Sequence, residues 1–294
     1  MLETFMATAV SDITPDLAAR AAAALESGKV LGFPELHFPL TTVDRDLIAQ
    51  GDAAGAAKNI SYNPASGVLK GSSLAGPARE RLVSMMTRFG AFTEALVLAI
   101  APFYQAGLRR GRTSFRPVEI AGRETSQRSN DTLRHVDAFP STPNHGARIL
   151  RVFSNVDQAG TPRNWLVGPD FISYAEAFLP SVSGRLLPGA ASFMALSGIT
   201  KSRRSLYDQT MLGLHDAGKR DIAWQVQSPA DEIKFLPGQM WMMFTDQTPH
   251  AAISGRNALE QTFYVAPEVL AAPEQAPLAV LSRLRGKDMS RLLL

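Results

Sequence analysis

Cysteine is absent from this 294-residue sequence. Its absence excludes disulfides, thiolate zinc sites, iron–sulfur clusters and cysteine nucleophiles, so any bound metal must be held by nitrogen and oxygen atoms. Charged residues are also few, at 19%, and the net charge is only +3. That balance mildly favours anionic partners. It lacks the dense Lys and Arg patterning of a dedicated nucleic-acid-binding protein, and we expect no nucleic-acid partner.

Long apolar runs are missing as well. The longest, Ala95 to Ala101, ends at Pro102 and is far too short to span a bilayer. The N-terminus has no basic segment followed by an apolar one, so we expect no signal peptide. These features predict a cytoplasmic protein, and the length is compatible with one large domain over residues 1–294.

The chain divides by composition into a helical and a β-rich part. Residues 1–112 are expected to form a helical buttress, with helices from Thr14 to Gly28 and from Arg79 to Leu98. From Thr113, short runs separated by Gly, Pro and Asn favour a β core over 113–267. Strands are expected over Lys29–Phe33, Arg148–Val156, Asn164–Gly168, Phe235–Thr245 and Leu259–Val265. An insertion at about 170–234 carries helical patches over Phe171–Phe178 and Leu206–Ala217, and a basic tail covers 268–294.

The most informative motif is a His-x-Asp pair followed by a distant histidine. His135 and Asp137 share the run Leu-Arg-His-Val-Asp-Ala-Phe, and His250 follows much later. Alternate side chains of a strand share a face, so positions 135 and 137 can present two ligands to one metal. Two imidazoles and one carboxylate form the facial triad of non-haem Fe(II) oxygenases. We therefore predict that these three residues bind the metal and are catalytic. The plainer interpretations are a capping Asp and a loop histidine.

The order of the expected strands around this motif resembles the double-stranded β-helix, or cupin-like jelly roll, of 2-oxoglutarate oxygenases. The resemblance implies a mainly β fold with helical decoration. It also implies Fe(II) as the bound metal, 2-oxoglutarate and O₂ as co-substrates, and ascorbate as the reductant. The distal carboxylate of 2-oxoglutarate needs a cation. Arg256 is the nearest candidate after His250, Arg151 and Arg148 are substitutes, and Asn155 is a candidate for the inner carboxylate.

A closer resemblance covers about residues 29 to 285. The runs that carry it are Lys58 to Tyr62, Thr113 to Pro117, His135 to Ser141, Arg148 to Asn155, Leu214 to Asp216, Phe244 to His250 and Glu260 to Phe263. They resemble the Kdo hydroxylase family of Gram-negative bacteria. This resemblance implies 3-hydroxylation of 3-deoxy-D-manno-oct-2-ulosonic acid (Kdo), linked to lipid A or its precursor, to give Ko.

Such an acceptor carries a carboxylate and phosphates, and arginines are expected to bind it. Arg116 and Arg134 are the candidates. The leucines and basic residues from Leu278 to Leu294 are compatible with a helix at the membrane surface, on the cytoplasmic face of the inner membrane. Two alternatives remain open. The protein could hydroxylate another small molecule or a protein side chain, or be a non-catalytic jelly roll that binds anionic glycolipids.

Overall fold

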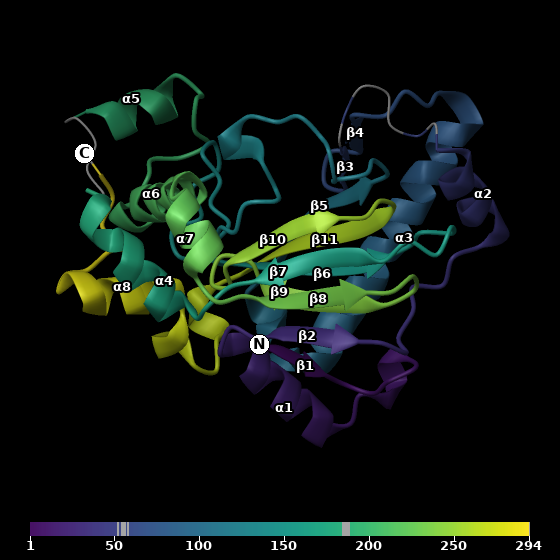
Figure 1. Cartoon of the computed structure of the whole chain (residues 1–294), viewed down its shortest axis with the longest axis horizontal. Coiled ribbons are helices and arrows are strands. Elements are labelled where there is room, and N and C mark those ends of the chain that lie inside the picture. The colour runs from purple at the N-terminus through teal and green to yellow at the C-terminus, as the bar shows by residue number, and fades with distance from the viewer. Residues whose placement is uncertain (52, 54–56, 58, 184–188, 294) are drawn as a thin grey trace.

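The computed structural model describes residues 1–51, 53, 57, 59–183 and 189–293. Its strands form two sheets (Figure 1). The larger sheet contains β1 (Leu2–Thr4), β2 (Val30–Phe33), β3 (Ile60–Asn63), β4 (Val68–Lys70), β5 (Leu108–Arg116), β6 (Arg148–Asn155), β9 (Met240–Phe244) and β11 (Ala258–Val265). The smaller sheet contains β7 (Arg163–Val167), β8 (Asp231–Phe235) and β10 (His250–Ser254).

The strand order identifies a jelly roll. The larger sheet runs β1-β2-β9-β6-β11-β5-β3-β4 and the smaller one β10-β7-β8. Strands β9, β6, β11 and β5 pair antiparallel with their neighbours, as do β10, β7 and β8. Aromatic side chains fill the space between the sheets, where Trp241 stacks on Phe235 and on Phe153. The expected jelly-roll core is confirmed.

Helices cover two parts of this core. They are α1 (Pro15–Glu26), α2 (Thr42–Gln50), α3 (Gly76–Ile100), α4 (Phe171–Phe178), α5 (Ala190–Leu196), α6 (Leu206–Arg220), α7 (Ile222–Gln227) and α8 (Pro277–Arg285). Helices α1, α2 and α3 share the main hydrophobic cluster with the larger sheet. Helices α4, α6 and α8 form a second cluster at the left of Figure 1, which includes Val136 beside the metal-binding motif.

Helix α3 is long and apolar enough, by length and composition, to cross a membrane. Nine of its residues are buried, among them Leu82, Phe89 and Leu96, which lie in the main cluster. A core helix of a soluble fold passes the same test. The burial of its apolar face against the sheet accounts for its composition.

Several elements lie close to their expected positions, and others differ. Helix α1 begins with Thr14 as N-cap, whose side chain accepts a hydrogen bond from the Leu17 amide, and α4 has the expected bounds. The β region starts earlier than Thr113, because β5 begins at Leu108. The N-terminal part is more than a helical buttress, because it adds four strands to the edges of the larger sheet. Helices also hold more of the described residues than strands do, so "mainly β" describes only the core.

The expected insertion and tail also need correction. Strand β8 lies at the end of the segment assigned to the insertion, because its alternating, half-exposed sequence gives only a short apolar signal. Helix α8 ends at Arg285, before the left-handed Gly286. Its buried Val280 and Leu281 face the second cluster, so α8 does not offer an apolar face to a membrane. Lys58, Leu294 and residues 184–188 lie outside the described part of the chain.

Candidate active site

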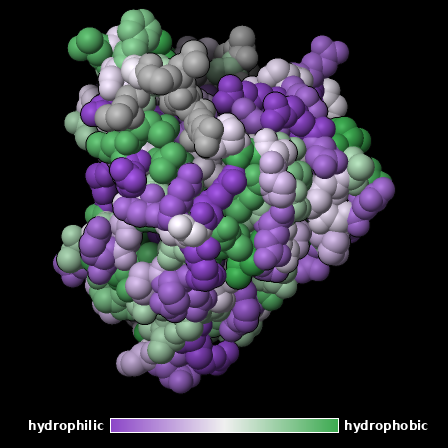
Figure 2. Space-filling model, turned by 90° about the vertical axis from the view of Figure 1, so that its left-hand side faces the viewer, coloured by the Kyte–Doolittle hydropathy of each residue, from purple (hydrophilic) through white to green (hydrophobic). Residues whose placement is uncertain are grey.

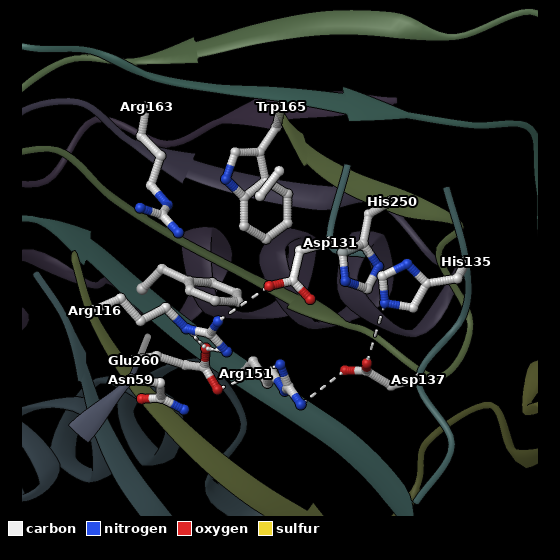
Figure 3. A pocket seen from close by; sticks show the side chains of 12 residues that line it. Asn59, Arg116, Asp131, His135, Asp137, Arg151, Arg163, Trp165, His250 and Glu260 are labelled. Carbon is white, nitrogen blue, oxygen red and sulfur yellow. Dashed lines mark hydrogen bonds and ion pairs between the residues drawn. The ribbon is translucent and has the colours of Figure 1, made fainter. Parts of the chain in front are cut away.

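The three predicted metal ligands meet inside the barrel (Figure 3). The ligand atoms of His135, Asp137 and His250 all lie within 4.8 Å of one another, and all three residues are buried. The backbones of His135 and His250 exchange two hydrogen bonds of 3.0 Å, and the Asp137 amide donates to the Thr245 carbonyl at 2.7 Å. Residues 135–137 are therefore extended against the start of β10, which turns positions 135 and 137 to the same face.

Hydrogen bonds fix the tautomer of both imidazoles. Nδ1 of His135 lies 2.7 Å from the Leu133 carbonyl oxygen, and Nδ1 of His250 lies 2.9 Å from that of Thr248. A carbonyl only accepts, so Nδ1 carries the proton in each ring and Nε2 keeps its lone pair. Burial lowers the pKa of His250, and burial together with the neighbouring His250 lowers the pKa of His135. Both rings are thus kept neutral, the form that binds a metal.

Asp137 is kept ionised by an arginine. Burial alone would raise its pKa, but the charge of Arg151 lowers it below the ordinary range. Nη2 of Arg151 lies 3.1 Å from Oδ2 of Asp137, and Nη1 lies 3.3 Å from Oε1 of Glu260. Glu260 in turn pairs with Arg116 at 2.7 Å. The donor set of two neutral nitrogens and one carboxylate, with no thiolate, fits Fe(II) with positions left open for other ligands.

A cavity of about 150 Å³ adjoins the triad. Its lining residues are Asn59, Arg116, Asp131, His135, Asp137, Arg151, Phe153, Arg163, Trp165, His250, Ala252 and Glu260. Roughly 30 Å³ is the share of one water in the liquid, so the space is large enough for a small organic molecule. Most of the lining is charged or polar, and the barrel wall around it is aromatic.

The cavity contains a buried cation without a counter-ion. Arg163 is 2% exposed and donates one hydrogen bond, of 3.2 Å, to the Gly255 carbonyl. Among the described residues no carboxylate lies within ion-pair distance of its guanidinium, and its Nε has no partner. Burial, and then the charge of Arg116, lower the pKa of Arg163 to about 9. The indole Nε1 of Trp165, two residues along β7 on the same face (Figure 3), also has no hydrogen-bond partner in the part of the chain that the structure describes. A bound anion would satisfy both groups.

A third histidine, His215, lies next to the triad. The ring of His215, on α6, meets the ring of His135 edge to face with their centroids 5.1 Å apart. Its Nδ1 bonds to Asp216 at 2.9 Å, and Asp216 pairs with Arg128 at 3.2 Å. Trp165 stacks on the other ligand, His250, with centroids 5.3 Å apart. Both imidazoles are therefore held in place by packed rings.

Among the residues predicted to bind the co-substrate or acceptor, Arg151 and Arg116 line the cavity, and four others do not. Arg256 lies in the β10–β11 turn, is 45% exposed and pairs with Asp157 at 3.2 Å. Arg148 is buried against Asp246 at 2.9 Å. The side-chain amide of Asn155 donates to the Thr161 and Phe235 carbonyls.

Arg134, predicted to bind the acceptor, is also used elsewhere. Its guanidinium donates to the carbonyls of Trp224, Gln225, Ser228 and Pro229 at the end of α7. It also lies over the Trp224 ring at 4.6 Å. The guanidinium of Arg134 therefore faces the end of α7, and its hydrogen bonds hold this helix against the segment before the triad.

Arg163, Trp165 and Glu260 are among the cavity residues that the sequence did not single out for a role. The available signal was the alternation Arg-Asn-Trp at the start of an expected strand, which puts a cation and an indole on one face. Many strands carry such pairs, and only the barrel shows which face is enclosed.

Comparisons with known proteins agree with this geometry. The model of the 3-deoxy-D-manno-oct-2-ulosonic acid (Kdo) hydroxylase family matches residues 9–288. The chain is similar to the apo structure of the Kdo hydroxylase KdoO, a non-haem Fe(II) α-ketoglutarate-dependent dioxygenase, with 43% identity, a TM-score of 0.93, and coverage of 98% of this chain and 97% of that one.

A second structure of KdoO, in complex with α-ketoglutarate and Fe(III), is 42% identical, with a TM-score of 0.92 and coverage of 99% of this chain and 97% of that one. A third, with succinate and Fe(III), is 41% identical with a TM-score of 0.93, covering 98% and 97%. No match was found among the curated proteins. The family match spans nearly the whole chain and includes the triad and its cavity, and the chain belongs to the Kdo hydroxylase family.

Proposed function

We propose that this protein is an Fe(II)- and 2-oxoglutarate-dependent dioxygenase that hydroxylates Kdo at C3, giving Ko, on a Kdo unit linked to lipid A or its precursor. The observation that carries the proposal is the meeting of three buried metal ligands with a cavity that contains an unpaired cation. His135, Asp137 and His250 would hold the metal. When bound, Fe(II) would activate O₂, so that 2-oxoglutarate is converted to succinate and CO₂ and one oxygen atom enters a C–H bond.

The end of the cavity lined by Arg163 and Arg116 is suited to bind the distal carboxylate of 2-oxoglutarate. Arg116 lies close enough to Arg163 for its charge to lower the pKa of Arg163. A carboxylate between them would pair with Arg163, which has no counter-ion among the described residues, and accept from the Trp165 indole. Charge-assisted, bidentate hydrogen bonds of this kind are strong and fix orientation. Arg116 is thereby reassigned from the acceptor to the co-substrate.

The remaining cavity residues hold the ligands in their reactive form. Arg151 keeps Asp137 ionised and also pairs with Glu260, which in turn pairs with Arg116. The metal-binding carboxylate and the arginine proposed to bind the co-substrate therefore belong to one network of ion pairs. Trp165 holds the His250 ring from one side, and His215 holds the His135 ring. Phe153 and Trp241 pack edge to face against Trp165 and make the barrel wall on that side apolar. Such a preorganised site protects the oxidising chemistry from side reactions.

The proposal includes the membrane at which the acceptor is bound and the reductant of the iron. A lipid-linked Kdo would be met at the cytoplasmic face of the inner membrane, with the protein bound peripherally. Ascorbate would serve as the reductant that keeps the iron as Fe(II). The exposed basic residues Lys201 and Arg291, which lie on two joined segments, support an anionic, lipid-linked acceptor.

Mass spectrometry of the lipid tests the function. Purified protein with Fe(II), ascorbate, 2-oxoglutarate and O₂ should add one oxygen atom to Kdo-bearing lipid A and release one succinate for each oxygen transferred. Lipid A without Kdo is the matched control and should stay unchanged. If another acceptor gains the oxygen while the Kdo lipid does not, the iron site is retained and the Kdo assignment fails.

A further inference from the structure

The helical side of the molecule exposes large apolar side chains that no described part of the chain covers. On α5, Phe193 is 64% exposed and Leu196 is 90% exposed, and Ile199 in the following turn is 56% exposed. Leu292 near the C-terminus is 51% exposed. Figure 2 views this side and shows hydrophobic and strongly hydrophilic surface close together in its upper part. Exposed apolar groups that gather in this way mark interaction surfaces.

The two segments that carry these side chains are joined. Ser205 and Leu292 form a β-bridge, and the Leu293 amide donates to the Arg204 carbonyl at 2.9 Å. The Leu206 amide donates to the Arg291 carbonyl at 2.8 Å. Figure 1 shows α5 and the C-terminus on the same side of the molecule. The exposed groups on α5, its following turn and the C-terminal segment therefore belong to one surface.

The same surface carries basic side chains. Residues 189–206 and 282–293 contain seven Lys and Arg residues and one acidic residue, Asp288. Arg203, Arg204 and Arg285 direct their guanidinium groups at other groups of the chain, mainly carbonyls, whereas Lys201, Arg283, Lys287 and Arg291 are exposed. We call Lys201 and Arg291, which lie on the two joined segments, together with Phe193, Leu196, Ile199 and Leu292, the α5 surface. A second copy of the chain would bring like charges together here, whereas an anionic surface would neutralise them.

The α5 surface is connected to the metal centre. The Lys201 amide donates to the Ser141 carbonyl at 3.0 Å, and Nη2 of Arg204 donates to the Pro140 carbonyl at 2.7 Å. Pro140 and Ser141 follow Asp137 by only three and four residues. A partner bound at the α5 surface therefore lies next to the segment that supplies two of the metal ligands.

We propose that the α5 surface docks on a bilayer of anionic phospholipids and so presents the lipid-linked acceptor to the cavity. The apolar side chains enter the boundary between headgroups and acyl chains, and the basic side chains bind lipid phosphates. This inference rests on the proposed function in one respect, that the acceptor is carried in a lipid. It differs from the expectation for residues 278–294, because the inserted groups come mainly from α5 and its turn.

Vesicle flotation tests the docking directly. The protein should float with phosphatidylcholine vesicles that contain phosphatidylglycerol, bind pure phosphatidylcholine weakly, and dissociate as salt is raised. The variant Phe193→Ser/Leu196→Ser/Ile199→Ser should lower the partition coefficient by about tenfold or more, because most of the inserted apolar surface is lost. Lys201→Glu/Arg291→Glu should lower it by roughly fivefold for each side chain.

Matched controls lie outside the α5 surface. Met6 is 65% exposed, nearly the same as Phe193, and Met6→Ser should bind as the unmodified protein does. Lys70→Glu, on β4, is the control for charge. The α5 variants should keep their circular dichroism and their 2-oxoglutarate decarboxylation. Equal binding to the two kinds of vesicle, or full binding by the triple Ser variant, would overturn the proposal.

Turnover separates this inference from the proposed function. The triple Ser variant should hydroxylate Kdo lipid in detergent micelles normally and Kdo lipid in vesicles slowly. If the unmodified protein oxidises Kdo lipid in neither form, the proposed function fails, while flotation still decides the docking. If light scattering shows a dimer that the triple Ser variant abolishes, and neither protein floats, the α5 surface binds a second copy and the proposal is wrong.

Discussion

Two buried arginines of the barrel, Arg148 on β6 and Arg163 on β7, have similar exposure and opposite surroundings. Arg148 is 1% exposed, pairs with Asp246 at 2.9 Å, donates to Gln247 at 2.6 Å and lies over the Phe244 ring at 3.9 Å. Arg163 is 2% exposed and has one backbone carbonyl as its hydrogen-bond partner among the described residues. Among the described residues, the charges that act on its pKa come from Arg116 and, beyond ion-pair distance, from Glu260, Asp131 and Glu119.

The difference shows which buried charge serves the fold and which serves a ligand. A buried charge costs free energy unless it is paired. For Arg148 the free-energy cost of burial is offset by the ion pair with Asp246 and the hydrogen bond to Gln247, so this charge is neutralised by the fold itself. For Arg163 the cost is left in place until an anion enters the cavity. The same reasoning places Arg134, whose two terminal nitrogens donate to carbonyls, with the residues that serve the fold.

The largest effect on activity is expected at the metal ligands. His135→Ala, Asp137→Ala and His250→Ala should each abolish turnover and Fe(II) binding while the fold is kept, because the triad serves a ligand and adds little to the packed core. Visible absorption of the anaerobic Fe(II) and 2-oxoglutarate complex, with circular dichroism, measures both effects. Asp137→Glu keeps the carboxylate and should retain part of the activity. Full turnover by any of the three Ala variants would contradict the assignment.

The largest effect on stability is expected at Arg148. Arg148→Met leaves Asp246 buried without its partner, and breaking a buried pair on one side costs about 3–5 kcal/mol of unfolding free energy. Urea denaturation of the metal-free protein measures this loss. The double variant Arg148→Met/Asp246→Leu removes both charges and should recover much of it. A stable Arg148→Met protein with a weakened affinity for 2-oxoglutarate would reverse the roles of the two arginines.

A smaller and more selective effect is expected at Arg163. Arg163→Met should leave stability unchanged or raise it, because an unpaired buried charge is removed. It should raise the KM for 2-oxoglutarate by an order of magnitude or more, since a lost charged hydrogen bond costs about 1.5–3 kcal/mol. Arg256→Ala is the control and should change this KM little, because Arg256 faces Asp157 and lies outside the cavity lining. A defect in Arg256→Ala alone would restore the expectation from sequence.

The sequence predicted the parts of this protein that depend on local pattern. The N-caps of α1 and α4 and the apolar periodicity of α3 follow from neighbouring residues, and the alternation of His135 and Asp137 is enough to put both side chains on one face. The same motif included the distant His250, and the resemblance to 2-oxoglutarate oxygenases supported it. The short strands β3 and β4 were missed, because they hold few apolar residues and form only by pairing with β5 or with each other.

The role of each arginine was decided by the tertiary structure. Arg256 is near His250 in sequence, but the β10–β11 turn, which contains the positive-φ residues Gly255 and Asn257, carries it to Asp157. Arg163 is far from the triad in sequence, yet β7 pairs with β10 and brings it to the same cavity. Charge is a property of the residue type and can be seen in the sequence. Whether a charge has a partner depends on which strands fold against each other, and that is what separates a structural arginine from one that binds a ligand.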